Sequence, residues 1–214
     1  MKKSNYLTDI VLITCAIVIT ALVVRREFFA QNEVPKAPVK PILVKGIAQK
    51  LGMHPDPENK IKIIEFMDYE CPFCREQEKV LKKVVAAYPD KVSIHRYHLP
   101  LDKIHPNAYM AANGAECAKE LGFFDQYHDT VFKKETFSQP KTDWKTIAEG
   151  IGVKQLNSFV TCQQDTTYKL RIEAHRSVAK EFGIHGVPAI VIKDKLYSGS
   201  LSFEQIKEAI DIKN

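Results

Sequence analysis

Two cysteines separated by two residues, Cys71 and Cys74, lie where a strand pattern gives way to a helical one. Residues 60–67 are crowded with Ile and Phe, as in a buried strand. Residues 71–88 repeat apolar side chains on one helical face, including Phe73, until a proline ends the helix. Cys71 is therefore expected at a helix N-terminus, where unpaired N–H groups and the helix dipole stabilise a thiolate. Such a sulfur attacks disulfides and also leaves readily.

This arrangement predicts different roles for the two cysteines. We expect Cys71 to be exposed and nucleophilic, and Cys74, one turn later, to be enclosed and to resolve a mixed disulfide. A static disulfide and half of a zinc site are the alternatives. A zinc site requires two further ligands, but the sequence contains no second C-x-x-C pair and no H-x-x-x-H motif. We therefore predict no metal site and no organic cofactor, because the cysteine pair is itself a redox group.

The rest of the chain alternates between strand and helix patterns, which predicts an α/β fold. A long helical block, residues 106–183, interrupts the middle. The other predicted elements are a β-prone run over 42–48, strands over 60–67, 91–98, 189–193 and 196–198, and helices over 71–88 and 203–212.

Charge is concentrated near the N-terminus. The net charge is +5, and residues 1–26 contribute +3 of it through two lysines, two arginines and one aspartate. The remainder is nearly neutral, so we predict no nucleic-acid surface. The whole chain, with 45% hydrophobic and 27% charged residues, has the composition of an ordinary globular protein, and the length of this remainder suits one domain.

An uninterrupted run of apolar, Thr or Cys residues, 10–24, stands between the basic pairs Lys2-Lys3 and Arg25-Arg26. We interpret it as an uncleaved signal anchor with Cys15 as an apolar filler. The alternatives are a cleaved signal peptide, for which Phe28-Phe29-Ala30 is a poor cleavage site, and a buried helix. The predicted organisation is an anchor over 1–30, a Pro-rich linker over 31–41 and a folded domain over 42–214.

Two segments carry a resemblance to a known family. Ile63-Ile64-Glu65-Phe66-Met67-Asp68-Tyr69-Glu70-Cys71-Pro72-Phe73-Cys74 resembles the active-site segment of DsbA-like thiol–disulfide oxidoreductases, and Gly186-Val187-Pro188-Ala189 resembles their cis-proline loop. These enzymes belong to the thioredoxin superfamily. The resemblance implies a thioredoxin-like α/β fold, in which helices flank a central sheet and a helical subdomain is inserted at about 103–183.

The resemblance also implies roles for individual residues. Cys71 would be the nucleophile and Cys74 the resolving cysteine. Pro188 would be cis and packed against them, and the backbone of Val187 would pair with an extended substrate. Glu65 would be a buried acid that moves the proton of the resolving thiol, rather than a surface carboxylate at a strand end.

The chain departs from the best-known DsbA enzyme at Phe73, where that enzyme has histidine beside the second cysteine. Phe73 and Pro72 separate the two cysteines here. A histidine cation would stabilise the thiolate, whereas phenylalanine does not. We therefore expect a weaker oxidant.

The sequence also gives expectations for the remaining cysteines of the folded domain and for four histidines. Similar proteins often carry a second disulfide in the helical block, which implies a bond between Cys117 and Cys162; two buried free thiols are the alternative. His95 and His98 should point to opposite faces of their strand, which argues against a metal site with His105. His175 is expected to be a core residue of its helix.

Taken together, these features predict an oxidase that donates the Cys71–Cys74 disulfide to newly exported proteins with cysteines. It would be a monomer on the cytoplasmic membrane, single-pass, with its domain in the periplasm or extracytoplasmic space. After signal cleavage it would instead be secreted or periplasmic. The resemblance implies a membrane quinone-linked reoxidant of the DsbB or vitamin-K-epoxide-reductase-like type. The alternatives are a reductase, an isomerase and a non-enzymatic, membrane-bound assembly or metal-handling module.

Overall fold

The computed structural model describes residues 10, 12–21, 40–133 and 142–211. The chain divides into two units, Met1–Ala37 and Pro38–Asn214. In the first unit, residues 12–21 are helical. Among the residues that the structure describes, no helix combines the length and hydropathy needed to cross a bilayer. Much of the predicted anchor and residues 31–39 of the predicted linker lie outside the described residues.

The second unit is built on a five-stranded sheet with the order β1-β5-β4-β2-β3. Strands β2 and β3 are parallel, whereas the β2–β4, β4–β5 and β1–β5 pairs are antiparallel. The strands are β1 (Ile42–Leu43), β2 (Ile61–Met67), β3 (Val92–His98), β4 (Ala189–Ile192) and β5 (Lys195–Ser198). The parallel pair is joined by a helix that begins at the cysteine pair, as the sequence predicts.

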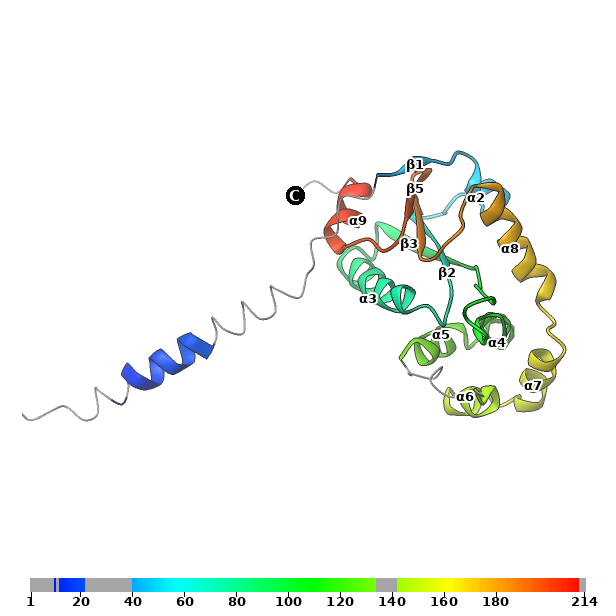
Figure 1. Cartoon of the computed structure of the whole chain (residues 1–214), viewed down its shortest axis with the longest axis horizontal. Coiled ribbons are helices and arrows are strands. Elements are labelled where there is room, and N and C mark those ends of the chain that lie inside the picture. Colours follow the sequence, from blue (N-terminus) through cyan, green and yellow to red (C-terminus); the bar gives the residue numbers. More distant parts are fainter. Residues whose placement is uncertain (1–9, 11, 22–39, 134–141, 212–214) are drawn as a thin grey trace, which may run out of the picture. The chain divides into compact units, whose positions relative to one another are not determined.

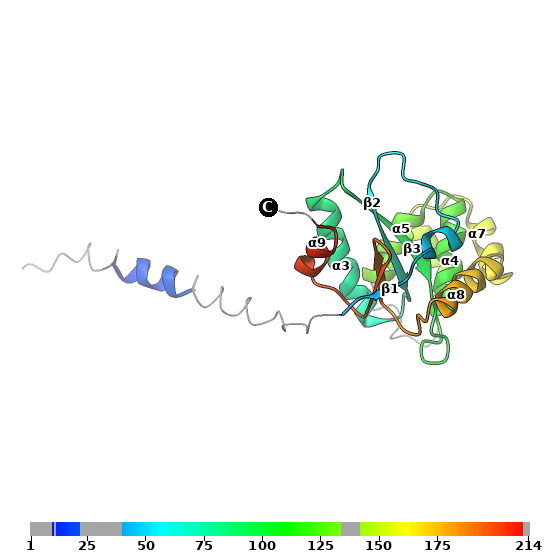
Figure 2. The same ribbon diagram turned by 90° about the horizontal axis from the view of Figure 1, so that it is seen from above.

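Helices cover both faces of this sheet, and a helical insertion lies at one end (Figures 1 and 2). Helices α3 and α9 lie on one face, and α2 and α8 lie on the other. The helices are α2 (Ile47–Lys50), α3 (Pro72–Ala87), α4 (Ala108–Glu120), α5 (Phe124–Lys133), α6 (Trp144–Gly150), α7 (Leu156–Gln164), α8 (Lys169–Glu181) and α9 (Phe203–Ala209). The helices between β3 and β4 fall within the predicted insertion.

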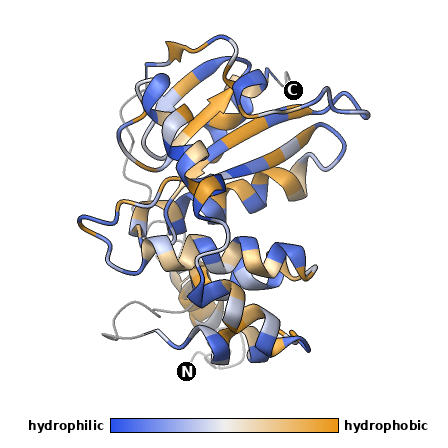
Figure 3. Ribbon diagram, turned by 90° about the vertical axis from the view of Figure 1, so that its right-hand side faces the viewer, coloured by the Kyte–Doolittle hydropathy of each residue, from blue (hydrophilic) through white to orange (hydrophobic). Residues whose placement is uncertain are grey.

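Alternation along β2 determines which side chains reach the site. Ile63 packs in the core beneath α3 and α9, whereas Ile64 and Phe66 pack in the core beneath α2 and α8. Successive strand residues point to opposite faces, so Glu65 points to the same face as Ile63. A carboxyl side chain is thereby placed under helix α3. Figure 3 shows hydrophobic colours along parts of the strands, interrupted by hydrophilic segments, and both kinds of colour on the surrounding helices.

The helical insertion packs around a core that it shares with the end of β2 and the cysteine pair. Buried alanines on α4 pack against Tyr127 of α5 and Phe159 of α7. The disulfide between Cys117 and Cys162 joins α4 to α7, and its presence confirms the second disulfide that the resemblance implied. The alternative of two free thiols is therefore wrong.

The predicted β-prone run over 42–48 is strand only at Ile42–Leu43. Gly46 has a positive φ of 85°, a conformation that glycine adopts without strain, and the chain turns there into α2. The turn buries Ile47 completely in the core beneath the sheet. The gain from burying this side chain outweighs continuation of a strand at the edge of the sheet.

Candidate active site

Cys71 lies at the junction between β2 and α3. It is the N-cap residue of α3, with an extended backbone conformation, and Pro72 occupies the first turn. Proline suits this position because the N–H that it lacks would have no partner within the helix. Cys74 follows one turn later, and both cysteines are free thiols. The structure thus brings the two sulfurs together in the dithiol form.

Both cysteines are buried. Cys74 is 0% exposed, as predicted, but Cys71 is only 4% exposed, and the expectation of an exposed Cys71 is wrong. The cause is the loop before β4: the Sγ of Cys71 lies 3.8 Å from the carbonyl oxygen of Val187. The Val187–Pro188 peptide bond in this loop is cis, as the resemblance implied.

Phe73 points away from the core. The sequence pattern places it near the apolar face of the helix, yet its side chain is 65% exposed. The side chains of α3 that are buried are instead Cys74, Gln77, Glu78, Leu81 and Val84. The helix therefore presents two polar residues to the interior and an aromatic ring to the surface beside the cysteines.

The two thiols have opposite shifts in pKa. A hydrogen bond from the Cys74 thiol, helped by the backbone N–H groups of Cys74 and Phe73, lowers the pKa of Cys71 to about 6. Burial and the charge of Asp68 oppose this effect. Burial, reinforced by Cys71 and Glu65, raises the pKa of Cys74 well above its ordinary value. At neutral pH Cys71 is thus a thiolate while Cys74 keeps its proton.

Glu65 is a buried acid beneath α3. It is 1% exposed, so the alternative of a surface carboxylate is wrong. Burial raises the pKa of Glu65 to about 8; Arg96 opposes this shift and Glu78 adds to it. Within the part of the chain that the structure describes, neither carboxylate oxygen of Glu65 has a hydrogen-bond partner. A carboxyl in this state exchanges a proton near neutral pH.

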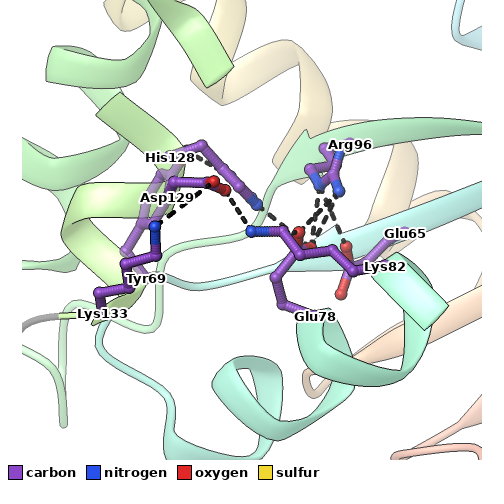
Figure 4. Close-up of polar contacts among 8 residues, drawn as sticks. All are labelled: Glu65, Tyr69, Glu78, Lys82, Arg96, His128, Asp129 and Lys133. Carbon is purple, nitrogen blue, oxygen red and sulfur yellow. Dashed lines mark hydrogen bonds and ion pairs between the residues drawn. The ribbon is translucent and has the colours of Figure 1, made fainter. Parts of the chain in front are cut away.

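A buried polar network surrounds Glu65, and we did not predict it from the sequence (Figure 4). Arg96 of β3 binds the carboxylate of Glu78 at 2.9, 3.0 and 3.2 Å, and its Nε lies 3.8 Å from Glu65. On the other side, Nε2 of His128 lies 3.2 Å from Glu78. The hydroxyl of Tyr69 lies 3.0 Å from Nδ1 of His128. The network joins the sheet, α3 and the helical insertion.

Asp68, Tyr69 and Glu70, the three residues before Cys71, each contact a different part of the helical insertion or of the segment that leads into it. Asp68 accepts a hydrogen bond from the Leu101 N–H and lies 2.8 Å from the His105 ring. Tyr69 contacts α5 through His128, and Glu70 accepts a hydrogen bond from the backbone N–H of Asn107, which precedes α4. The insertion is therefore attached directly to the peptide that carries the redox cysteine.

The histidines take separate positions. His98 lies 3.2 Å from Glu116 of α4, and its backbone N–H donates to Nδ1 of His175. His95 instead contacts Ser93 on its own strand. Across residues 40–133 and 142–211, no three His, Cys, Asp or Glu side chains lie close enough to hold a metal ion.

The family model described as Thioredoxin matches residues 54–212. The chain therefore belongs to the thioredoxin family. Its five-stranded sheet carries a helical insertion between β3 and β4, and the Cys71–Cys74 pair lies at the start of α3.

Three known proteins illustrate this relationship. The Na(+)/H(+) antiporter NhaA 3 of Salinispora tropica is 28% identical over 72% of this chain, which spans only 23% of the antiporter's length. Disulfide bond formation protein D of Bacillus subtilis is 21% identical, and the match covers 71% of each chain. The crystal structure of oxidised BdbD from Bacillus subtilis superimposes with a TM-score of 0.65 at 17% identity, covering 80% of this chain and 97% of that one. This last likeness shows the fold.

Proposed function

We propose that this chain is an extracytoplasmic thiol–disulfide oxidase that gives the Cys71–Cys74 disulfide to exported proteins. The observation that carries the proposal is the opposite pKa shifts of the two thiols, with Cys71 at about 6. A stabilised Cys71 thiolate favours the reduced form of the pair, and a pair that favours reduction is an oxidant toward other thiols. The name of the Bacillus relative, disulfide bond formation protein D, supports the same direction.

The site supports a two-step exchange. A substrate thiolate attacks Sγ of Cys71, the Cys71–Cys74 bond breaks, and Cys74 leaves as a thiolate that takes a proton from Glu65. A second substrate thiolate then attacks the substrate sulfur of the mixed disulfide, and Cys71 leaves as a thiolate. The substrate loses two electrons, which the Cys71–Cys74 pair accepts. The backbone of Val187, beside cis-Pro188, is available to an extended substrate strand.

We also propose an oxidising location for the domain. The disulfide between Cys117 and Cys162 supports this location, because structural disulfides persist mainly outside the reducing cytosol. In this proposal residues 1–30 anchor the chain in the cytoplasmic membrane and residues 31–41 act as a linker. A membrane quinone-linked protein of the DsbB or vitamin-K-epoxide-reductase-like type would restore the Cys71–Cys74 disulfide.

The reduction potential of Cys71–Cys74 tests the proposal. We would equilibrate the full chain, carrying Cys15→Ala to remove the remaining free thiol, with glutathione buffers and quantify the oxidised fraction. A potential well above that of the glutathione couple is expected for an oxidase. A thioredoxin-like low potential would overturn the oxidase assignment in favour of the reductase. Cys71→Ser should abolish exchange, whereas a non-enzymatic assembly module would keep its function.

A further inference from the structure

Arg96 lies between the buried carboxyl groups of Glu65 and Glu78 but binds them unequally. Its guanidinium makes three hydrogen-bonding contacts of 3.2 Å or less with Glu78, while the nearest approach to Glu65 is 3.8 Å. Both oxygens of Glu65 are left without hydrogen-bond partners among the described residues. A charged, multiply hydrogen-bonded pair is much stronger than a contact at 3.8 Å. Glu78 therefore holds the cation that Glu65 would otherwise bind.

Glu78 is itself fixed from the helical insertion. Although burial opposes the shift, His128 and Arg96 lower the pKa of Glu78, so its carboxylate is charged at neutral pH. Burial lowers the pKa of His128, which leaves its ring neutral. The His128 ring lies between two polar groups: the Tyr69 hydroxyl is 3.0 Å from Nδ1, and Glu78 is 3.2 Å from Nε2 without hydrogen-bond geometry. Figure 4 shows these groups converging on Glu78 from β3 and α5.

We propose that Glu78 is a positioning residue for proton transfer between Glu65 and Cys74: by engaging Arg96 it withholds the cation from Glu65 and leaves Glu65 able to hold a proton at neutral pH. The inference deepens the proposed function and rests on it for the role of Glu65. Figure 4 places Glu78 between the sheet and the insertion, so the insertion takes part in setting the proton affinity of the site.

The charged groups that face the two carboxylates give the direction of the effect. Glu65 faces Arg96 on β3, and Glu78 and Cys74 on α3. Glu78 faces Arg96, His128 on α5, and Lys82 at 3.8 Å, which is itself paired with Asp129. Replacing Glu78 by glutamine removes a negative charge near Glu65 and frees Arg96 to bind Glu65. Both changes favour the ionised form of Glu65.

The first measurement follows the protonation of Glu65 directly. In the reduced full chain, the infrared carbonyl band of a buried protonated carboxyl is recorded against pH and assigned by its loss in Glu65→Gln. In Glu78→Gln the band should disappear at a pH at least one unit lower, a tenfold change in the acid dissociation constant. The matched control is Glu76→Gln, an exposed carboxylate on the same helix, paired with Lys79, which should leave the titration unchanged. An unshifted band in Glu78→Gln overturns the inference.

A kinetic measurement separates this inference from the proposed function. The rate at which the oxidised full chain oxidises a dithiol peptide is measured against pH, and its alkaline limb should move to lower pH in Glu78→Gln in step with the band. If the wild type fails to oxidise the peptide while the band still shifts, the oxidase proposal fails and the role of Glu78 in holding Arg96 stands. If the infrared band shifts but the alkaline limb of the rate profile does not, Glu78 does not act on the reaction, and the inference is overturned.

Glu78→Gln leaves Arg96 without its charged partner. If this variant does not fold, a second variant tests the inference. Glu78→Asp keeps the buried charge but shortens the side chain by one methylene, which weakens its hold on Arg96. The band should move in the same direction by a smaller amount. A band that stays in place in Glu78→Asp overturns the inference.

Discussion

The Sγ of Cys71 lies 3.8 Å from the carbonyl oxygen of Val187, although 116 residues separate them in the chain. The sulfur is thus enclosed between the N-terminus of α3 and the loop that contains cis-Pro188. In the proposed exchange, a thiolate that attacks Cys71 would arrive alongside the backbone of Val187. The helix end would then set the reactivity of the sulfur, and the loop would set the direction of approach.

The exposed ring between the cysteines offers a direct test of how the thiolate is stabilised. Phe73 is 65% exposed, so Phe73→His should be accommodated without repacking. An imidazolium beside the sulfur should lower the pKa of Cys71 by about one unit and raise the reduction potential by roughly 30 mV. Thiolate absorbance and glutathione equilibria measure the two quantities. Phe73→Leu is the control, and equal values for the histidine and leucine variants would refute the electrostatic account.

Glu65 should make the stability of the domain depend on pH. Its pKa is raised from 4.5 to about 8 in the folded state. Between these values the folded state holds a proton that the unfolded state has released, so stability falls as the pH rises through this interval. Glu65→Gln removes this loss, on the order of 1.4 kcal/mol per unit of pKa difference. In urea unfolding at several pH values, the free energy of unfolding of Glu65→Gln should rise relative to that of the wild type as the pH increases. A difference between the two that does not change with pH would contradict the prediction.

The disulfide in the insertion should contribute substantially to stability. Cys117 and Cys162 are separated by 45 residues, and closing a loop of this size restricts the unfolded chain. The chain-entropy estimate is about 4 kcal/mol. The double variant Cys117→Ala with Cys162→Ala should lower the free energy of unfolding in urea by about this amount, while Cys15→Ala should match the wild type. A loss below about 1 kcal/mol would mean that the unfolded chain gains little freedom.

Close packing between α4 and α5 depends on the absence of a side chain at Gly114. A Cβ there would clash with the hydroxyl of Tyr127, whose ring is fully buried. That hydroxyl also donates a hydrogen bond to the carbonyl oxygen of Ala111 at 3.2 Å, so the ring resists movement. Gly114→Ala should therefore destabilise the protein by about 1–3 kcal/mol. Gly150→Ala, whose Cβ meets no atom within 4 Å, should be nearly neutral in the same thermal melts.

Local patterns predicted the segment around the cysteines well. The crowded apolar residues of β2 and the periodic helix α3 need only near neighbours to be recognised, so the position of Cys71 at a helix N-terminus followed directly. The burial of Cys71 could not be predicted in this way, because the loop that covers it comes from Val187. Likewise, spacing alone places Phe73 on the apolar face of α3. Its side chain is exposed because the buried face of this helix instead follows Cys74, Glu78 and Leu81.

The network around Glu65 depends on residues from three elements. Glu78, Arg96 and His128 each read as an ordinary polar residue in its own helix or strand, and only tertiary packing brings them together. One sequence signal could have indicated Glu78: it lies four residues after Cys74 and three before Leu81, on the face of α3 that is buried. A charged residue on such a face needs a partner of opposite charge, which Arg96 supplies.

The contacts of Asp68, Tyr69 and Glu70 have a consequence for how members of this family diversify. Each side chain binds a different segment, from the chain after β3 to the approach to α4 and helix α5. A replacement insertion taken from a relative would have to supply matching partners for three neighbouring side chains at once. Helices α6 and α7 make none of these contacts. Changes in α6 and α7 can therefore leave these three contacts intact, although α7 stays tied to α4 by the Cys117–Cys162 disulfide.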